Sequence, residues 1–239
     1  MANFSIRQLK FAVLEVLADR KGHRYNLLGG RGNQPGALEH RLSATFDSGD
    51  RQLADAAFTE LLHAQLIQPT YDDLVEPGNW LVITEAGREA LKRHALDDLD
   101  VALKAISPEL VEQRDGAWSA IASARPDALR QAAHSARELL VQTLKLAAPD
   151  SEVRAQAGFV PHPKSGVTRR HRLKFIMKKR GAVSDSEVAL AEKACELVEA
   201  AHDKLVAEAH SRTTPLLTDV HDALSVAEIA LRRVLTSSR

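Results

Sequence analysis

The feature that most constrains the fold is a helical apolar repeat between Pro126 and Pro149. Apolar residues recur there every three or four positions, at Leu129, Ala132/Ala133, Ala136, Leu139/Leu140, Thr143/Leu144 and Leu146/Ala147. A stripe at this spacing marks the buried face of an amphipathic α-helix. The two prolines bound this helix, because proline is tolerated in the first turn of a helix but not in its interior.

The same spacing predicts further helices over residues 96–106, 110–124, 169–180, 184–209 and 216–235. Ser184 opens one of them with a capping-box pattern, SDSE. On that helix Cys195 and His202 belong to the heptad-spaced apolar stripe, so we interpret them as an inert core thiol and a packed core histidine. Aromatic residues make up only 4% of the chain, which favours helices packed through Ala, Leu and Val.

The first third of the chain predicts helices interrupted by two short strands. Helices are expected over residues 5–19, 37–43, 47–62 and 85–94, strands over 66–70 and 80–84, and mostly loop over 21–36. The run LLHAQLIQP…WLVITEAGREAL resembles the wing region of MarR- and PadR-like winged helices. That resemblance covers about residues 5–95 and implies a winged-helix fold.

A winged helix reads DNA with basic or amide side chains on its third helix and in its wing. Here the predicted wing carries Asp72, Asp73 and Glu76 and no basic residue. Phosphates repel such a wing. Protein docking or dimerisation is therefore favoured for this domain, with DNA recognition as the alternative.

A second feature is the basic stretch from Lys164 to Gly181, which contains no acidic residue. Its eight cations are Lys164, Arg169, Arg170, Arg172, Lys174, Lys178, Lys179 and Arg180. The other residues hold 24 basic against 32 acidic side chains, so a positive patch lies on an acidic protein. Such a patch indicates a polyanion, most often nucleic acid. The alternative is a solvated charged face.

Bulk properties exclude several classes of protein. No apolar run approaches the length of about 20 residues that a membrane helix needs, and no signal-peptide pattern opens the chain. The single Cys195 excludes an internal disulfide and a multi-cysteine zinc site. A cytoplasmic protein without membrane contact is expected. Residues 1–100 carry 11 basic and 15 acidic groups and residues 101–239 carry 21 and 17, which suggests two domains with different roles.

No glycine-rich phosphate loop, HExxH pattern or nucleophile elbow is present. The pairs His202-Asp203 and His221-Asp222 suggest a metal phosphohydrolase, but further spaced ligands are missing, so neither a metal nor another cofactor is predicted. Metal-free RNA cleavage needs an acid–base group and a cation for the phosphorane charge. His210, with Arg212 after it and Lys204 before it, has these ingredients.

The segment RDGAWSAI…DALRQAAHSARELLVQTLKLAAPDSEV…TRRHRLKFIMKKRG…LVAEAHSRT is similar to the predicted pPIWI-associating nuclease family of bacterial defence islands. The similarity spans about residues 112–236. Its most specific pieces are residues 135–138 (SARE), 148–150 (APD) and 168–170 (TRR).

The helical plan also resembles the HEPN superfamily, whose ribonucleases use an Arg-x4–6-His motif across a dimer. In this chain Lys204 stands at the spacing where the motif has arginine. The position stays cationic but lacks the bidentate grip of a guanidinium on phosphate.

The sequence thus predicts a mainly α fold, with a winged-helix domain at residues 1–95, a linker helix at 96–111 and an all-α HEPN-like domain at 112–239. The resemblance implies that the protein is a metal-independent endoribonuclease of a bacterial defence system. It also implies a homodimer that acts on RNA rather than DNA and works beside other defence proteins. The predicted catalytic residues are His210, Lys204 and Arg212. The predicted nucleic-acid ligands are Arg169, Arg170, Arg172, Lys174, Lys178, Lys179 and Arg137. The alternative is a non-catalytic regulator or adaptor that binds nucleic acid.

Overall fold

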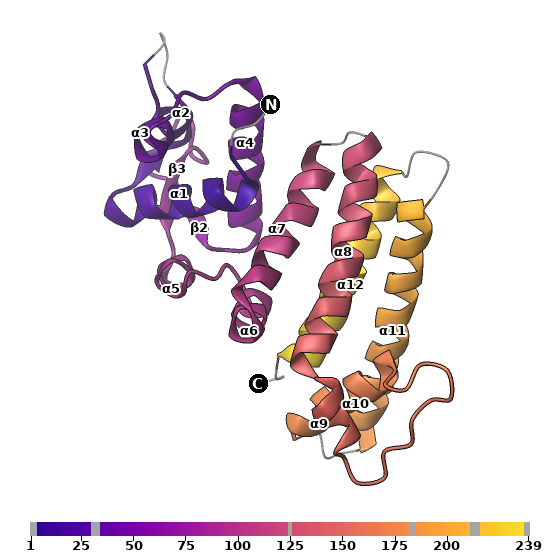
Figure 1. The fold of residues 1–239 in the computed structure, drawn as a ribbon. Helices are drawn as coiled ribbons and strands as arrows, with labels where there is room; N and C mark the ends of the chain where they lie inside the picture. Colours follow the sequence, from indigo (N-terminus) through magenta and orange to yellow (C-terminus); the bar gives the residue numbers. More distant parts are fainter. Residues whose placement is uncertain (1–3, 30–33, 124–125, 182–184, 211–215, 237–239) are drawn as a thin grey trace. The chain divides into compact units, whose positions relative to one another are not determined.

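The structure is a computed structural model that describes residues 4–29, 34–123, 126–181, 185–210 and 216–236. The chain divides into two compact units, residues 1–97 and 98–239. Both are dominated by helices, and a small sheet lies in the first (Figure 1). The prediction of a mainly α-helical protein is confirmed.

Over residues 4–29 and 34–97, the first unit combines five helices with a three-stranded antiparallel sheet of order β1-β3-β2. Its elements are α1 (Ile6–Asp19), β1 (Gly22–His23), α2 (Arg24–Leu28), α3 (Ala37–Leu42), α4 (Ser48–His63), β2 (Ile67–Pro69), β3 (Trp80–Ile83) and α5 (Glu85–Arg93). The prediction of loop over residues 21–36 is partly wrong, because β1 and α2 form there. The side chain of His23 caps α2, a signal that apolar periodicity does not report.

Thr84 and Gly87 explain the sequence pattern that follows β3. The Thr84 hydroxyl accepts the backbone N–H of Gly87 and so caps α5. A β-carbon at Gly87 would lie 2.1 Å from the carbonyl oxygen of Leu66, so only glycine lets α5 approach β2 this closely. The close approach of Gly87 to Leu66 packs the first turn of α5 against the residue that precedes β2.

In its described residues, the second unit is a bundle of four long helices with three shorter ones. Its elements are α6 (Asp98–Ile106), α7 (Pro108–Ser123), α8 (Pro126–Ala147), α9 (Asp150–Arg154), α10 (Arg169–Lys179), α11 (Asp185–His210) and α12 (Leu217–Leu235). Helices α7 and α8 run antiparallel, as do α11 and α12, and α9 and α10 cover one end of the bundle (Figure 1). The small residues Ala132, Ala133 and Ala136 are fully buried on α8 and allow neighbouring helices to approach closely.

A buried charge network joins α6, α7 and α12. The Arg114 guanidinium donates to both carboxylate oxygens of Glu228 at 2.7 Å and to Asp100 at 2.7 Å. The Trp118 indole also donates to Glu228, at 2.6 Å. Leu99 and Leu103 of α6 are fully buried in the core of the bundle. Residues 98–106 therefore pack as part of the second unit.

Among the residues that the structure describes, no helix is both long enough and apolar enough to cross a membrane. The connection between α8 and α10 opens with α9 and contains an antiparallel bridge between His162 and Gly166. This bridge gives the connection before α10 a defined turn.

Candidate nucleic-acid interface

Helix α10 carries most of the basic stretch, and its local sequence explains where it starts. The Thr168 hydroxyl accepts the N–H of His171, and the His171 ring accepts the N–H of Thr168, which closes a capping box. Leu173, Phe175 and Ile176 are buried against the bundle. The first turn holds Arg169 and Arg170 but no acidic residue. Cations are unfavourable at that end of the helix macrodipole, so these arginines do not serve helix stability.

Arg172 and Arg180 each bond the end of another helix. The Arg172 guanidinium donates to the carbonyl of Ala148 at the end of α8 and to the carboxylate of Asp150. Its side chain is only 11% exposed. The Arg180 guanidinium donates to carbonyls at the end of α12, those of Arg233, Val234 and Thr236. Burial lowers the pKa of Arg180, but an arginine stays protonated in proteins. Both cations complete helix ends.

Arg170, Lys174 and Lys178 form an exposed line along α10, which we call the cationic stripe. The three residues are four positions apart and therefore share one face of the helix. In the described part of the chain, Lys174 and Lys178 have no hydrogen bond or ion pair. Lys179 lies beside the stripe, 3.4 Å from Glu152. Lys164 is exposed on the turn before α10. Lys174 and Lys178 are thus available to an external anion.

Arg169 connects α10 to α11. A guanidinium nitrogen of Arg169 lies 3.8 Å from a carboxylate oxygen of Asp203, and the same oxygen lies 3.2 Å from Nδ1 of His202. Asp203 precedes His210 by seven residues, so the two share one face of α11, about 10.5 Å apart along its axis. His210 is the last residue of α11 and is exposed. The first turn of α10 thus meets the α11 face that carries His210.

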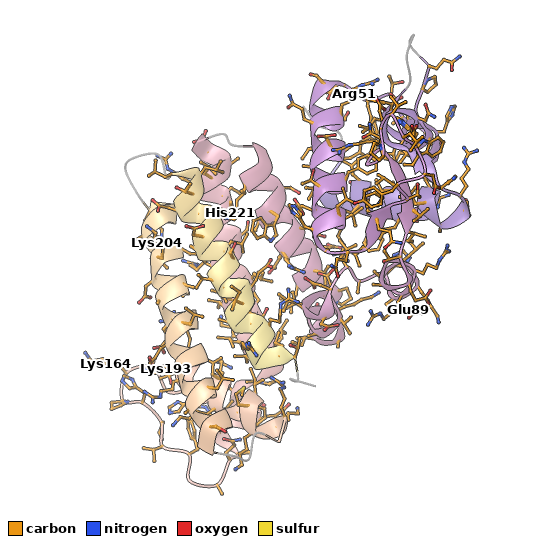
Figure 2. The ribbon with its side chains drawn as sticks, turned by 180° about the vertical axis from the view of Figure 1, so that it is seen from behind. Arg51, Glu89, Lys164, Lys193, Lys204 and His221 are labelled. Carbon is orange, nitrogen blue, oxygen red and sulfur yellow. The ribbon has the colours of Figure 1, made fainter. Side chains whose placement is uncertain are left out.

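Lys204 lies on a different side of α11 from His210. The Lys204 amine lies 3.7 Å from Asp219 of α12. Six residues separate Lys204 from His210, which places them about 120° apart around the helix. Figure 2 shows Lys204 and His221 toward one end of the bundle and Lys164 and Lys193 toward the other. Arg212 lies outside the described residues.

Arg137 pairs with its neighbour Glu138 on α8. This hydrogen bond holds the pKa of the Glu138 carboxyl below its usual range. Both side chains are about a quarter to a third exposed, at 26% and 30%. A phosphate that approaches Arg137 therefore competes with the Glu138 carboxylate for the guanidinium.

The His-Asp pairs are local contacts between neighbours on a helix. His221 lies 3.3 Å from Asp222, and its ring packs edge-on against Trp118, with ring centres 5.3 Å apart. Among the residues that the structure describes, no group of three His, Cys, Asp or Glu side chains is placed to hold a metal ion.

Sequence reasoning missed the acidic partners of the basic stretch, Asp150, Glu152 and Asp203. No spacing rule links them to α10, since they lie on other helices. Arg172, two residues after the TRR piece, hydrogen-bonds Ala148 and Asp150 of the APD piece. Covariation of two positions in related sequences is the kind of signal that reports such a contact, and a single sequence does not contain it.

Comparison with known proteins gives one result. No curated protein and no solved structure matches the chain. Residues 103–234 match the family model described as predicted pPIWI-associating nuclease. The matched region includes α7 to α11 and nearly all of α12, hence the basic helix, the Arg169–Asp203 pair and His210. Because the match covers more than half of the chain, the protein belongs to the family of predicted pPIWI-associating nucleases.

Proposed function

We propose that this protein is a metal-independent endoribonuclease of a bacterial defence system. The family description supports nuclease activity and, in the words "pPIWI-associating", a role beside a pPIWI protein. On this proposal residues 1–95 are a winged-helix domain, residues 112–239 are an HEPN-like domain, and the chain is a cytoplasmic homodimer.

The observation that carries the proposal is the contact between Arg169 and Asp203. It brings the cationic end of α10 to the α11 face on which His210 lies two turns further along. A strand whose phosphates follow the cationic stripe would continue toward His210. The stripe supplies binding and His210 supplies proton transfer, so binding and chemistry come from different helices.

The proposed reaction is a transesterification within RNA. The His210 imidazole takes the proton of a 2′-hydroxyl, and the 2′-oxygen attacks the adjacent phosphorus. The bond from phosphorus to the 5′-oxygen breaks, and that oxygen takes up a proton from an acid or water. The products are a 2′,3′-cyclic phosphate and a 5′-hydroxyl. Lys204 or Arg212, from the same or the partner subunit, stabilises the charge of the phosphorane.

Cleavage of a labelled RNA and of the DNA of the same sequence, both with a chelator present, tests the proposal. RNA should be cut and DNA should not, because DNA lacks the nucleophile. His210→Ala should abolish cleavage while the binding of RNA persists. His221→Ala is the matched control, since His221 is an exposed histidine on α12 beside an aspartate. Undiminished cleavage by His210→Ala would refute its assignment.

A non-catalytic nucleic-acid-binding adaptor is the second candidate, and the same cationic stripe favours it. This candidate predicts salt-dependent binding of RNA without turnover, with or without added metal ions. The chelator experiment therefore separates the two proposals directly.

A further inference from the structure

The loop between β2 and β3, residues 70–79, presents large apolar side chains to solvent. Leu74 is 98% exposed and Val75 is 88% exposed. Tyr71, at the start of the loop, is 68% exposed. Burial of an aliphatic side chain stabilises a protein, because it removes apolar surface from water. Two adjacent aliphatic residues at full exposure therefore indicate a contact that a single unit does not make.

Hydrogen bonds hold this loop in a defined shape. The Asp73 carboxylate accepts the N–H groups of Val75 and Glu76 and the indole N–H of Trp80. The bond from Val75 is the largest of the influences that hold the pKa of Asp73 below its usual range. These bonds therefore fix the shape of the loop. Leu74 and Val75 lie at its end, and we call them the tip.

Two side-chain contacts anchor the loop to β1 and the turn before it. Lys21 lies 2.9 Å from Asp72, and His23 lies 3.2 Å from Glu76. Tyr71 has a φ of +56°, a left-handed conformation that is strained for a bulky residue. Strain of this kind persists where the surrounding contacts fix it, and such positions concentrate at functional sites.

A groove with apolar and charged lining residues lies elsewhere on the same unit. It has a volume of about 990 Å³, and the residues that line it come from α1, α3 and α5 and the residues just after α1. Its apolar lining consists of Val16, Ala18, Ala37 and Leu91, and its charged and polar rim consists of Glu15, Asp19, Arg20, His40 and Arg41. Glu15 is paired with Arg41 at 2.6 Å, so part of the acidic rim is neutralised. Arg20 is exposed there and complements the acidic loop.

The loop and the groove are linked through adjacent residues. Lys21 anchors the loop and its neighbour Arg20 lines the groove. A two-fold axis between two copies lets each copy insert its tip into the groove of the other. Such an arrangement closes as a dimer and forms no filament.

We propose that two copies of this chain dimerise through their first units, with Leu74 and Val75 of each copy in the α1–α3–α5 groove of the other. Nucleic acid does not fit this loop, because Asp72, Asp73 and Glu76 surround the apolar tip. The inference concerns the first unit alone and does not depend on whether the chain cleaves RNA.

Sedimentation velocity of the full chain over a wide range of concentration tests the proposal. We expect a reversible dimer whose dissociation constant rises at least tenfold in Leu74→Asp and in Arg20→Glu. Both substitutions fall on exposed side chains and leave the unit folded, which circular dichroism checks. Leu216→Asp is the matched control, since Leu216 is a 65% exposed leucine in the second unit.

An equimolar mixture of the two variants sharpens the test. In a mixed dimer, the intact tip of Arg20→Glu meets the intact groove of Leu74→Asp, so one of the two contacts is restored. The mixture should dimerise more tightly than either variant alone. A chain that stays monomeric at every concentration, or a dimer that neither substitution weakens, would overturn the proposal and assign the tip to another partner.

Discussion

Arg169 and Asp203 join the first turn of α10 to α11, with their nearest nitrogen and oxygen 3.8 Å apart. Asp203 is 74% exposed and Arg169 is 35% exposed, so water screens the pair. Exposed ion pairs of this kind contribute about 0.2–1 kcal/mol to stability. The pair therefore contributes little to the fold, and its main consequence is electrostatic: the Asp203 carboxylate occupies the Arg169 guanidinium at the cationic end of α10.

Removal of that carboxylate should strengthen the binding of RNA. In Asp203→Asn, Arg169 becomes available to phosphate, and the affinity for RNA should rise by about two- to fivefold, the equivalent of one exposed ion pair. Fluorescence anisotropy with a 2′-O-methyl oligonucleotide, which lacks the nucleophile, measures binding without cleavage. Asp222→Asn on α12 is the control and should have no effect. Weaker binding by Asp203→Asn would mean that this carboxylate itself belongs to the binding site.

Loss of a lysine from the cationic stripe should change the salt dependence of binding. For single strands, each phosphate contact contributes about −0.7 to the slope of log K against log salt concentration. Lys174→Ala and Lys178→Ala should each reduce the slope by about that amount and leave the unfolding temperature unchanged. Lys193→Ala, which removes an exposed lysine of α11 paired with Glu196, is the control. Equal slopes in all four proteins would show that RNA does not contact the stripe.

Arg172→Ala should act on stability instead. The substitution leaves the Ala148 carbonyl and the Asp150 carboxylate without their guanidinium partner, at a cost of about 1–3 kcal/mol. Urea denaturation measures this loss, and Arg172→Lys should restore only part of it, because an amine lacks the planar fork of donors. A variant with unchanged stability that had lost the binding of RNA would show that Arg172 is a phosphate ligand after all.

Arg172 and Arg170 also show what the sequence could predict about the site. Helical periodicity places both on α10, and the charge of the stretch indicates a polyanion. The contacts of each arginine determine its role. Arg172 hydrogen-bonds Ala148 at the end of α8 and Asp150 in α9, whereas Arg170 lies on the exposed stripe. Such contacts join residues 22 positions or more apart, and local propensity carries no information about them. The sequence therefore predicts the helix and its charge, but not which cations are available.

The same limit applies to the fold. Apolar spacing predicts the long helices well, because burial of one face determines them. It does not predict β1 and α2, because two and five residues are too few to show a repeating apolar pattern. It also gives no sign that the Arg114 side chain is only 12% exposed. Arg114 is accommodated only because Asp100 and Glu228, on two other helices, neutralise it.

A last prediction concerns Glu39, the buried carboxylate of the first unit. It is 3% exposed, and it accepts the N–H groups of Gly36 and Phe46, each at 2.7 Å. Burial alone would raise the pKa of Glu39, but these two bonds and the charge of Arg51 outweigh burial, so the pKa lies below the usual 4.5. The folded state thus stabilises the ionised form of the Glu39 side chain, compared with the unfolded chain.

The stability that Glu39 contributes should be fully present above pH 4.5 and should be lost as the pH falls through its lower folded pKa. Glu39→Gln leaves one buried N–H without an acceptor and should destabilise the first unit by about 1–3 kcal/mol at neutral pH. Hydrogen exchange of the amides in residues 37–51, at neutral pH and in acid, measures the difference from the parent protein, which should shrink in acid. Glu89→Gln, an exposed carboxylate on α5 (Figure 2), is the control. A difference that stayed constant with pH would assign the effect of Glu39 to packing and not to its charge.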